Sequence, residues 1–365
     1  MENLKIGIYS LGLIGGSLAM SIRKKLPNTR ITAINRSAEP IRMALDTGVI
    51  DSGGQALNED FKDLDFIFLC GPVSTNIDFM KKLRPYIGPD TILTDVGSVK
   101  GEIHAAVKEI LPGCRFIGGH PMAGSERSGY INASPTLLEN AFFILTPQEG
   151  IPEELVEKYS AFVRAIGSIP LVLSPEGHDY VAAAVSHVPH FAAYALVQLL
   201  KESDLEDEPM KRIAAGGFKD ITRIASSDPT MWQQISLANR EQILKVLNGY
   251  IERLYGFKGL VERSDGAALK KLFQEMKDYR DSIGIPASGA KNAIHDFYVD
   301  IEDEAGAISR VAALLSDAGI SIKNIGIIHN RSYEKGALRI EFYGDKEKSA
   351  AAEALEKEGY TVTAP

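Results

Sequence analysis

Cysteine and tryptophan are scarce in this chain of 365 residues, which holds two cysteines and one tryptophan. Cys70 and Cys114 show no paired spacing, so we expect neither a disulfide framework nor a zinc site. Basic residues number 40 against 48 acidic ones, and no basic stripe is present, which argues against a nucleic-acid partner. A small-molecule substrate is therefore the better expectation.

A targeting segment and a long apolar run are also missing. "MENLK" leads straight into a strand pattern without a basic stretch, an apolar core or a cleavage site, so we expect a cytoplasmic protein. No apolar run approaches the roughly 18 residues that a membrane span requires, so no membrane partner is expected. With 45% hydrophobic residues, the chain is long enough for two or three domains that each bury a core.

Residues 1–172 alternate short apolar runs with stretches of helix length. The runs are "KIGIYS", "RITAIN", "DFIFLC", "TILTDVG", "RFIGGH", "AFFILTP" and "IPLVLS". This alternation predicts βαβ units with a buried, mainly parallel sheet. The fold class is therefore α/β, with a Rossmann-type dinucleotide-binding domain over 1–172.

The pattern changes to helix alone over residues 173–285. Ser174 is a predicted helix cap with Pro175 in the first turn, and Pro189 predicts an irregularity further along the helix. Apolar residues recur at spacings of three and four in excess of what one small bundle needs. We therefore expect an all-α domain that forms a homodimer.

A small-residue linker, "GIPASGAKNA" over 284–293, precedes a third region. Over 293–365 the order of elements is β-α-β-β-α-β, which predicts a small α+β domain of the split ferredoxin-like kind.

The first strand runs into "IYSLGLIGGSLA", which nearly matches the Gly-x-Gly-x-x-Gly dinucleotide turn. Gly12 and Gly15 fill the second and third glycine positions, whereas Ser10 stands in the first. We predict that residues 10 to 15 contact the cofactor; the candidates are Ser10, Gly12, Leu13, Ile14 and Gly15. The alternative is a glycine-rich turn of some other α/β domain.

The second strand ends in Asn35, Arg36 and Ser37, where an acidic residue would normally bind the ribose. A guanidinium at this point favours a 2′-phosphate through charge-assisted hydrogen bonds. NAD and NADP both stay open as cofactors, and so does the alternative that Arg36 is a solvated surface charge.

Two stretches follow later strands, where ligands of open α/β sheets bind. "TDVGSVK" carries Ser98 and "GGHPMAGSERSG" carries His120. A neutral His120 could accept a hydroxyl proton while a hydride leaves the same carbon, with Ser98 holding hydroxyl and ring in line. A hydrogen-bonded loop histidine is the alternative.

The helical region offers two further groups of polar side chains. "SHVPH" places His187 and His190 on one helix face, and "GFKDITRIASSDPTMW" places the cations of Lys219 and Arg223 four residues apart. Such a pair of cations suits a dianionic substrate. Structural histidines and a solvated helix face are the alternatives.

Taken in order, "LGLIGGSLA", "DVGSVK", "GGHPMAGSE", "SHVPH" and "GFKDITRIASSDPTMW" closely resemble the prephenate dehydrogenases of tyrosine biosynthesis. The resemblance implies an oxidative decarboxylation of prephenate to 4-hydroxyphenylpyruvate, usually with NAD and without a metal. His120 would be the base, positioned by Ser98. Arg223 would bind a substrate carboxylate with help from Lys219 and His190, beside His187. Glu126 and Trp232 match positions that gate or line the site.

The third region resembles the ACT regulatory domain that some members of this family carry. By that resemblance, Ala305, Gly306, Ala307 and Asn324 would hold an amino-acid effector, and tyrosine, the pathway product, would inhibit the enzyme.

Three other functions stay open at this point. One is an arogenate dehydrogenase, because arogenate differs from prephenate only in its side chain. The second is a β-hydroxyacid dehydrogenase, which would rely on a lysine in the helical region. The third is an amino-acid sensor that keeps the scaffold without the activity.

Overall fold

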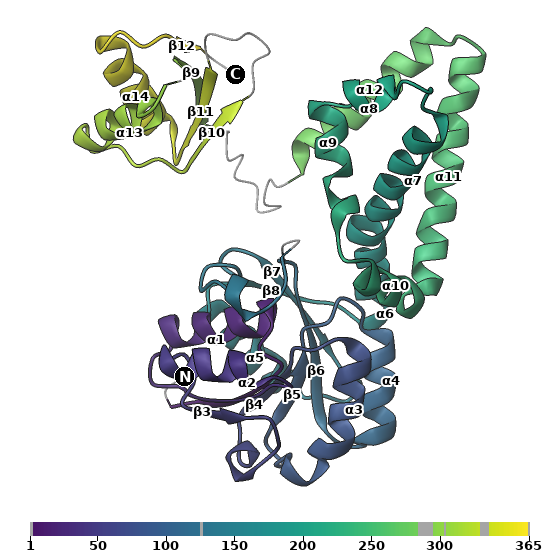
Figure 1. Ribbon diagram of the computed structural model, residues 1–365, viewed down its shortest axis with the longest axis vertical. Coiled ribbons are helices and arrows are strands. Elements are labelled where there is room, and N and C mark those ends of the chain that lie inside the picture. The colour runs from purple at the N-terminus through teal and green to yellow at the C-terminus, as the bar shows by residue number, and fades with distance from the viewer. Residues whose placement is uncertain (1–2, 125–126, 284–294, 303, 329–335, 364–365) are drawn as a thin grey trace. The chain divides into compact units, whose positions relative to one another are not determined.

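The computed structural model describes residues 3–124, 127–283, 295–302, 304–328 and 336–363. They form two compact units, Met1–Gly259 and Leu260–Pro365. Figure 1 shows the order of the elements along the chain.

The first unit is built on a sheet of eight strands in the order β3-β2-β1-β4-β5-β6-β7-β8. Neighbouring strands are parallel except β6 and β7, which pair antiparallel, so the predicted α/β class with a mainly parallel sheet is confirmed. The short strand β3 has no apolar run and was not predicted. The strands are β1 (Lys5–Tyr9), β2 (Arg30–Ile34), β3 (Ser52–Gly54), β4 (Phe66–Leu69), β5 (Ile92–Asp95), β6 (Arg115–Pro121), β7 (Phe142–Pro147) and β8 (Ile169–Val172).

Helices cover both faces of this sheet, which is why its central strands are apolar throughout. Helices α1, α2 and α5 lie on one face and α3 and α4 on the other (Figure 1). These helices are α1 (Leu13–Lys25), α2 (Ala38–Asp46), α3 (Val73–Leu83), α4 (Gly101–Ile110) and α5 (Glu153–Ala165), with short 3-10 turns at Glu59–Phe61, Arg84–Tyr86 and Tyr130–Asn132.

The chain is helical after β8, as the sequence predicts. The Ser174 side chain accepts a hydrogen bond from the Gly177 N–H and caps α6, and Pro175 lies in its first turn. The irregularity predicted at Pro189 is a π-helical turn, Ala183–His187, directly before it. The remaining elements are α6 (Pro175–Ala182), α7 (Val188–Ser203), α8 (Pro209–Ile213), α9 (Gly216–Thr222), a 3-10 turn (Arg223–Ser226), α10 (Pro229–Ala238) and α11 (Arg240–Glu262).

The helical stretch Pro175–Ser203 passes the length and composition criteria for a membrane span, with a window of mean hydropathy 1.3. Its uninterrupted apolar runs are short, as the sequence indicates, and alanine and valine raise the mean hydropathy around a few polar residues. Those polar residues, His178, Asp179 and His187, are buried and hydrogen-bonded within the first unit.

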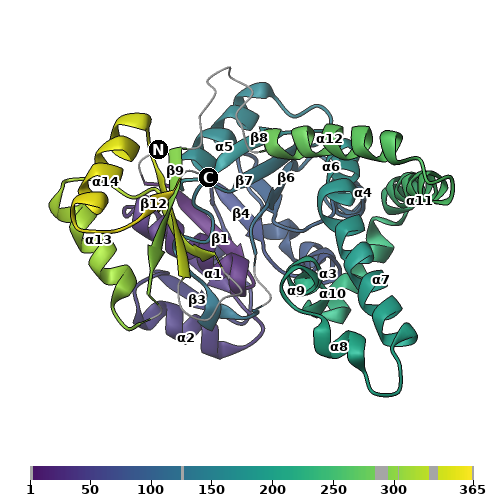
Figure 2. The ribbon, with the colours of Figure 1, turned by 90° about the horizontal axis from the view of Figure 1, so that it is seen from above.

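The second unit contains a four-stranded sheet in the order β10-β11-β9-β12 with antiparallel neighbours, as the β-α-β-β-α-β pattern predicts. Helices α13 and α14 pack on one face of it, as Figures 1 and 2 both show. The elements are α12 (Gly266–Ser282), β9 (His295–Ile301), α13 (Ala307–Asp317), β10 (Asn324–Ile328), β11 (Gly336–Phe342), α14 (Asp345–Lys357) and β12 (Val362–Thr363).

Candidate active site

The turn between β1 and α1 joins a strand directly to a helix, which is the context that the dinucleotide motif requires. Ser10, in the first glycine position, has a φ of 75°, in the left-handed region that glycine adopts without cost. A Cβ at Gly15 would lie 3.0 Å from the Cβ of Cys70 and closer still to the carbonyl oxygen of Ser10. Packing therefore requires glycine at position 15. Ser10 has a left-handed backbone conformation that is unfavourable for a residue with a side chain.

Gly12 is different, because a Cβ there would meet no protein atom within 4 Å. Gly12 is the N-cap residue of α1 and provides no side-chain cap. The turn thus leaves an uncrowded approach to the N-terminal end of α1, where Leu13 and Ile14 begin the helix and where phosphate groups bind well. These features fit a dinucleotide pyrophosphate.

Asn35, at the end of β2, braces this turn from the inside. Its Oδ1 accepts a hydrogen bond from the Leu11 N–H at 3.0 Å, and its Nδ2 donates to the carbonyl oxygen and the hydroxyl of Ser37. The side-chain amide is therefore committed to the protein itself. Arg36 is exposed, and its backbone carbonyl oxygen accepts a hydrogen bond from the Gln55 side chain. Of the predicted residues at the end of β2, the guanidinium of Arg36 is therefore the candidate for binding the ribose or its phosphate.

His120 lies near the C-terminal end of β6 and is buried. Its Nδ1 is 2.7 Å from Nε2 of His178 on α6, and Nδ1 of His178 is 2.8 Å from Oδ1 of Asp179. The same carboxylate accepts the backbone N–H groups of Lys100 and Gly101 at the start of α4. A continuous hydrogen-bonded chain thus joins the predicted base to a buried carboxylate.

A buried ion pair supports the strand ends beside His120. The Lys100 ammonium, fully buried, pairs with Asp95 and also donates to the Gly119 carbonyl oxygen at 2.7 Å. Asp95 in turn accepts the N–H groups of Gly97 and Gly119. These bonds hold the end of β5 against the end of β6.

Burial sets the protonation of the histidines at this site. It lowers the pKa of His120 well below 6.5, and the buried ammonium of Lys100 lowers it further. Burial also lowers the pKa of His187 to about 4. His120 is therefore neutral at physiological pH, the state that a proton acceptor requires.

A second cluster of rings lies along α7 and α10. Trp232 stacks on His190 with ring centroids 3.6 Å apart and meets the edge of His187 at 5.9 Å. Asn239 links this cluster to the first one, because its Nδ2 donates to the Asp179 carbonyl oxygen and to His187 Nδ1. The Trp232 indole N–H is buried and has no hydrogen-bond partner within the described ranges.

Other predicted residues are placed less centrally. Ser98 is half-buried in the loop between β5 and α4, and among the described residues its hydroxyl has no hydrogen bond to the His120 ring. Lys219 and Arg223 are both exposed, at the end of α9 and the start of the 3-10 turn that follows it. Glu126 lies outside the residues that the structure describes.

The predicted effector residues lie in the second unit. Ala305 and Gly306 are exposed in the turn before α13, which begins at the buried Ala307, and Gly306 has a φ of 89°. Asn324 is exposed at the start of β10.

Sequence reasoning missed four residues of the site: His178, Asp179, Lys100 and Asn239. Lys100 ends the quoted motif "TDVGSVK", and the adjacent pair His178-Asp179 opens the long helical stretch, so their polarity in apolar surroundings was the available signal.

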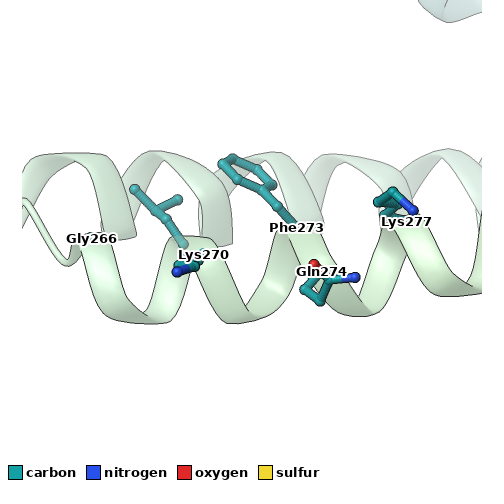
Figure 3. A pocket seen from close by; sticks show the side chains of 6 residues that line it. Gly266, Lys270, Phe273, Gln274 and Lys277 are labelled. Atoms are coloured by element: carbon teal, nitrogen blue, oxygen red, sulfur yellow. The ribbon is translucent and has the colours of Figure 1, made fainter.

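A surface hollow along α12 contains none of the predicted site residues. It is a shallow face of a single helix, lined by Gly266, Leu269, Lys270, Phe273, Gln274 and Lys277 (Figure 3).

Comparison with known proteins gives this arrangement a family. The model for the prephenate dehydrogenase nucleotide-binding domain matches residues 18–169, and that for the prephenate dehydrogenase dimerization domain matches residues 174–275. The prephenate dehydrogenase of Bacillus subtilis (strain 168) is 39% identical over 351 residues, which is 96% of this chain and 95% of that protein. The chain belongs to the prephenate dehydrogenase family.

Solved structures of the prephenate dehydrogenase family agree with this assignment. The Aquifex aeolicus prephenate dehydrogenase, crystallised with hydroxyphenyl propionate and NAD+, matches with a TM-score of 0.72 and 36% identity, covering 78% of this chain and 99% of that one. Synechocystis arogenate dehydrogenase matches with a TM-score of 0.70 and 30% identity, covering 76% and 99%. The Rossmann-type domain and the helical dimerisation domain are therefore those of this family.

Proposed function

We propose that the protein is a prephenate dehydrogenase that converts prephenate to 4-hydroxyphenylpyruvate and carbon dioxide in tyrosine biosynthesis. The observation that carries this proposal is a buried, neutral His120 near the end of β6. Strand β6 belongs to the same sheet as β1, which leads into the glycine turn at Gly12 and Gly15. Bound NAD supplies the nicotinamide carbon that takes the hydride from C4 of the substrate. His120 accepts the C4 hydroxyl proton and returns it to that oxygen when loss of carbon dioxide from C1 makes the ring a phenol.

The driving force of aromatisation lies in the substrate, so the protein mainly has to orient it. Arg223 and Lys219 offer cations for the two carboxylates of prephenate. His190 donates from Nδ1 to the Ser186 carbonyl oxygen at 2.9 Å and has a pKa lowered by burial, so its Nε2 is an acceptor suited to a hydroxyl rather than a carboxylate. Ser98 would then act on the substrate hydroxyl and not through the His120 ring.

Two further residues complete the substrate site in this proposal. Trp232 supplies an aromatic wall and a buried N–H donor, backed by His187. Glu126 is assigned to the site by family resemblance only.

An assay of the purified protein tests the proposed reaction. Prephenate or arogenate is mixed with NAD or NADP, and reduced nicotinamide is followed at 340 nm, as usual for such enzymes. We expect turnover with prephenate and a loss of about 100-fold to 10,000-fold in His120→Asn. His104→Asn is the matched control, because His104 is a half-buried histidine of the same domain, bonded to Thr146. Equal activity of His120→Asn and the wild type would contradict the proposal.

The cofactor is proposed to be NAD, with NADP as a second acceptor. The Aquifex aeolicus structure contains NAD+, and the nucleotide-binding family model covers most of the first domain. The exposed guanidinium of Arg36 is the group that would pair with a 2′-phosphate.

Arogenate is a second candidate substrate because the similar Synechocystis enzyme is an arogenate dehydrogenase. Turnover with arogenate alone in the same assay would keep the chemistry and change the substrate. No turnover with either would favour the amino-acid sensor.

We further propose that the protein is a homodimer formed through its helical domain. Its second family model is a dimerization domain, and large apolar side chains are exposed on these helices, including Leu199, Ile213, Leu237 and Tyr255. Light scattering on the purified chain should give twice the mass of 39.7 kDa. The cytoplasmic location stays a prediction.

Tyrosine is proposed as an inhibitor that binds an ACT-like domain over 293–365. The β-α-β-β-α-β order and the glycine turn at Gly306 before α13 support this assignment. Because coupling between sites is reciprocal, prephenate should weaken tyrosine binding. Deletion of 293–365 should abolish inhibition and spare turnover, whereas unchanged inhibition would contradict the proposal.

A further inference from the structure

His178 lies between the predicted base and a buried carboxylate, and the proposed reaction does not by itself assign it a task. We propose that His178 and Asp179 are positioning residues that hold His120 in the tautomer with a proton on Nδ1 and an open lone pair on Nε2. This inference rests on the proposed function, in which Nε2 accepts the substrate's hydroxyl proton.

The direction of the hydrogen bonds starts at Asp179. Burial would raise the pKa of this carboxyl, but hydrogen bonds from His178 and from the backbone N–H groups of Lys100 and Gly101 outweigh it, and the pKa is lowered. The carboxylate also lies at the N-terminus of α4, where negative charge is stabilised. Because an ionised carboxylate only accepts hydrogen bonds, Nδ1 of His178 must be the donor.

The charge on His178 decides the next bond. A second proton on this ring would place a cation against the His120 ring in a site that already holds the buried ammonium of Lys100, whose charge opposes protonation of His120. In the proposal His178 has its only proton on Nδ1, so its Nε2 is an acceptor. At 2.7 Å, Nδ1 of His120 must then donate to it.

The consequence for His120 is a single tautomer. With its proton on Nδ1, the neutral ring has an unprotonated Nε2, which is the atom left for the substrate. When Nε2 takes the proton, the resulting imidazolium keeps its Nδ1–H bonded to His178, which is backed by the charge of Asp179. The groups that face His120 are otherwise Lys100 and His187, with Asp95 bonded to the adjacent Gly119 N–H.

The ring positions are fixed from several sides. Asp179 is bonded through its side chain to the start of α4 and through its carbonyl oxygen to Asn239. His120 is on a strand that pairs with β7 on one side and β5 on the other. The chain of rings therefore has little freedom to adopt the other tautomer by reorientation.

NMR of the full-length protein with ¹⁵N-labelled histidine tests the tautomer directly. The signals of His120, one of seven histidines, are identified by their absence in His120→Asn. We expect a protonated Nδ1 and an unprotonated Nε2 near pH 7.5. A proton on Nε2 in the wild type would overturn the proposal, whatever substrate the enzyme uses and whether or not any variant folds.

Kinetics of matched variants test the consequence. His178→Leu should lower kcat by about 100-fold with the KM for NAD unchanged, because the wrong tautomer impairs only the proton transfer. His178→Gln restores an acceptor for Nδ1 and should return to within about 10-fold of the wild type. His104→Leu removes a half-buried ring of α4 that is bonded to Thr146 and should keep kcat.

Two kinetic results would overturn the proposal: wild-type kcat in His178→Leu, or a His178→Gln variant as slow as His178→Leu at equal thermal stability. If the enzyme turned over arogenate alone, the proposed substrate would change, but the NMR measurement of the tautomer and the kinetics of the His178 variants would still test the proposal.

Discussion

Gly12 and Gly15 lie three residues apart in one turn, yet the structure assigns them different reasons for being glycine. A methyl group at Gly15 would lie 3.0 Å from Cys70 Cβ and closer than that to the Ser10 backbone. A methyl group at Gly12 would meet no protein atom within 4 Å, and its φ of −89° is open to any residue. Alanine substitution should therefore separate the stability of the turn from its cofactor binding.

The magnitude follows from what has to move. At Gly15 the obstacle is largely backbone, which cannot rotate away as a side chain can, so Gly15→Ala should cost about 1–3 kcal/mol, as overpacking of a core usually does. For a domain of roughly 150–250 residues this is a decrease in Tm of about 2–4 °C per kcal/mol. Gly12→Ala should change the free energy of unfolding by less than about 0.5 kcal/mol. Its methyl group instead occupies the approach of the pyrophosphate.

Thermal unfolding by circular dichroism and the KM for NAD are measured on both variants. Gly12→Ala should keep the wild-type Tm and raise the KM for NAD by at least about 10-fold, whereas Gly15→Ala should lower the Tm and raise the KM. A Gly15→Ala protein as stable as the wild type, or a destabilised Gly12→Ala, would refute the packing argument. An unchanged KM in Gly12→Ala would refute the assignment of the turn to the cofactor.

Three other predictions concern strain, charge and pH. Ser10→Gly should raise the free energy of unfolding by up to about 1 kcal/mol, because it relieves a left-handed conformation that costs roughly 1–2 kcal/mol while glycine loses more entropy; a lower Tm would contradict this. Arg36→Ala should lower kcat/KM for NADP relative to NAD, and an unchanged ratio would show that Arg36 does not bind the phosphate. Burial lowers the pKa of both His104 and His187 to about 4, so protons bind the unfolded chain first and stability should fall as pH drops from 6.5 towards 4, which urea titrations at several pH values measure.

The sequence was most informative where the signal is local. Apolar runs of strand length predicted every strand of the large sheet except β3, whose "SGG" has no side chain to mark it as a strand. The cap at Ser174 and the helix irregularity at Pro189 follow from short-range chemistry, and both are present. Ser10 was predicted to lie in a dinucleotide turn, which stays a prediction, and its φ of 75° lies in the left-handed region that favours glycine.

The site itself was only partly accessible in this way. His120 was identified from its position after a strand, but its partner His178 is 58 residues away and on a helix. Asn35 was predicted to contact the cofactor, yet both ends of its side chain are used inside the protein, at Leu11 and Ser37. A residue type indicates what a side chain can bond to, whereas its actual partner depends on which elements pack together.

By itself, the sequence determined the order of nearly all elements, with β3 as the exception, and the residue types available for chemistry, because backbone preferences and apolar periodicity act over a few residues. Only the tertiary structure decided which partners the histidines bond to, and with them the tautomer that we propose for His120. Those partners depend on burial, which removes water as a competing partner, and on contacts between β6, α4 and α6 that place His120 2.7 Å from His178 and Asp179 2.7 Å from the Lys100 N–H.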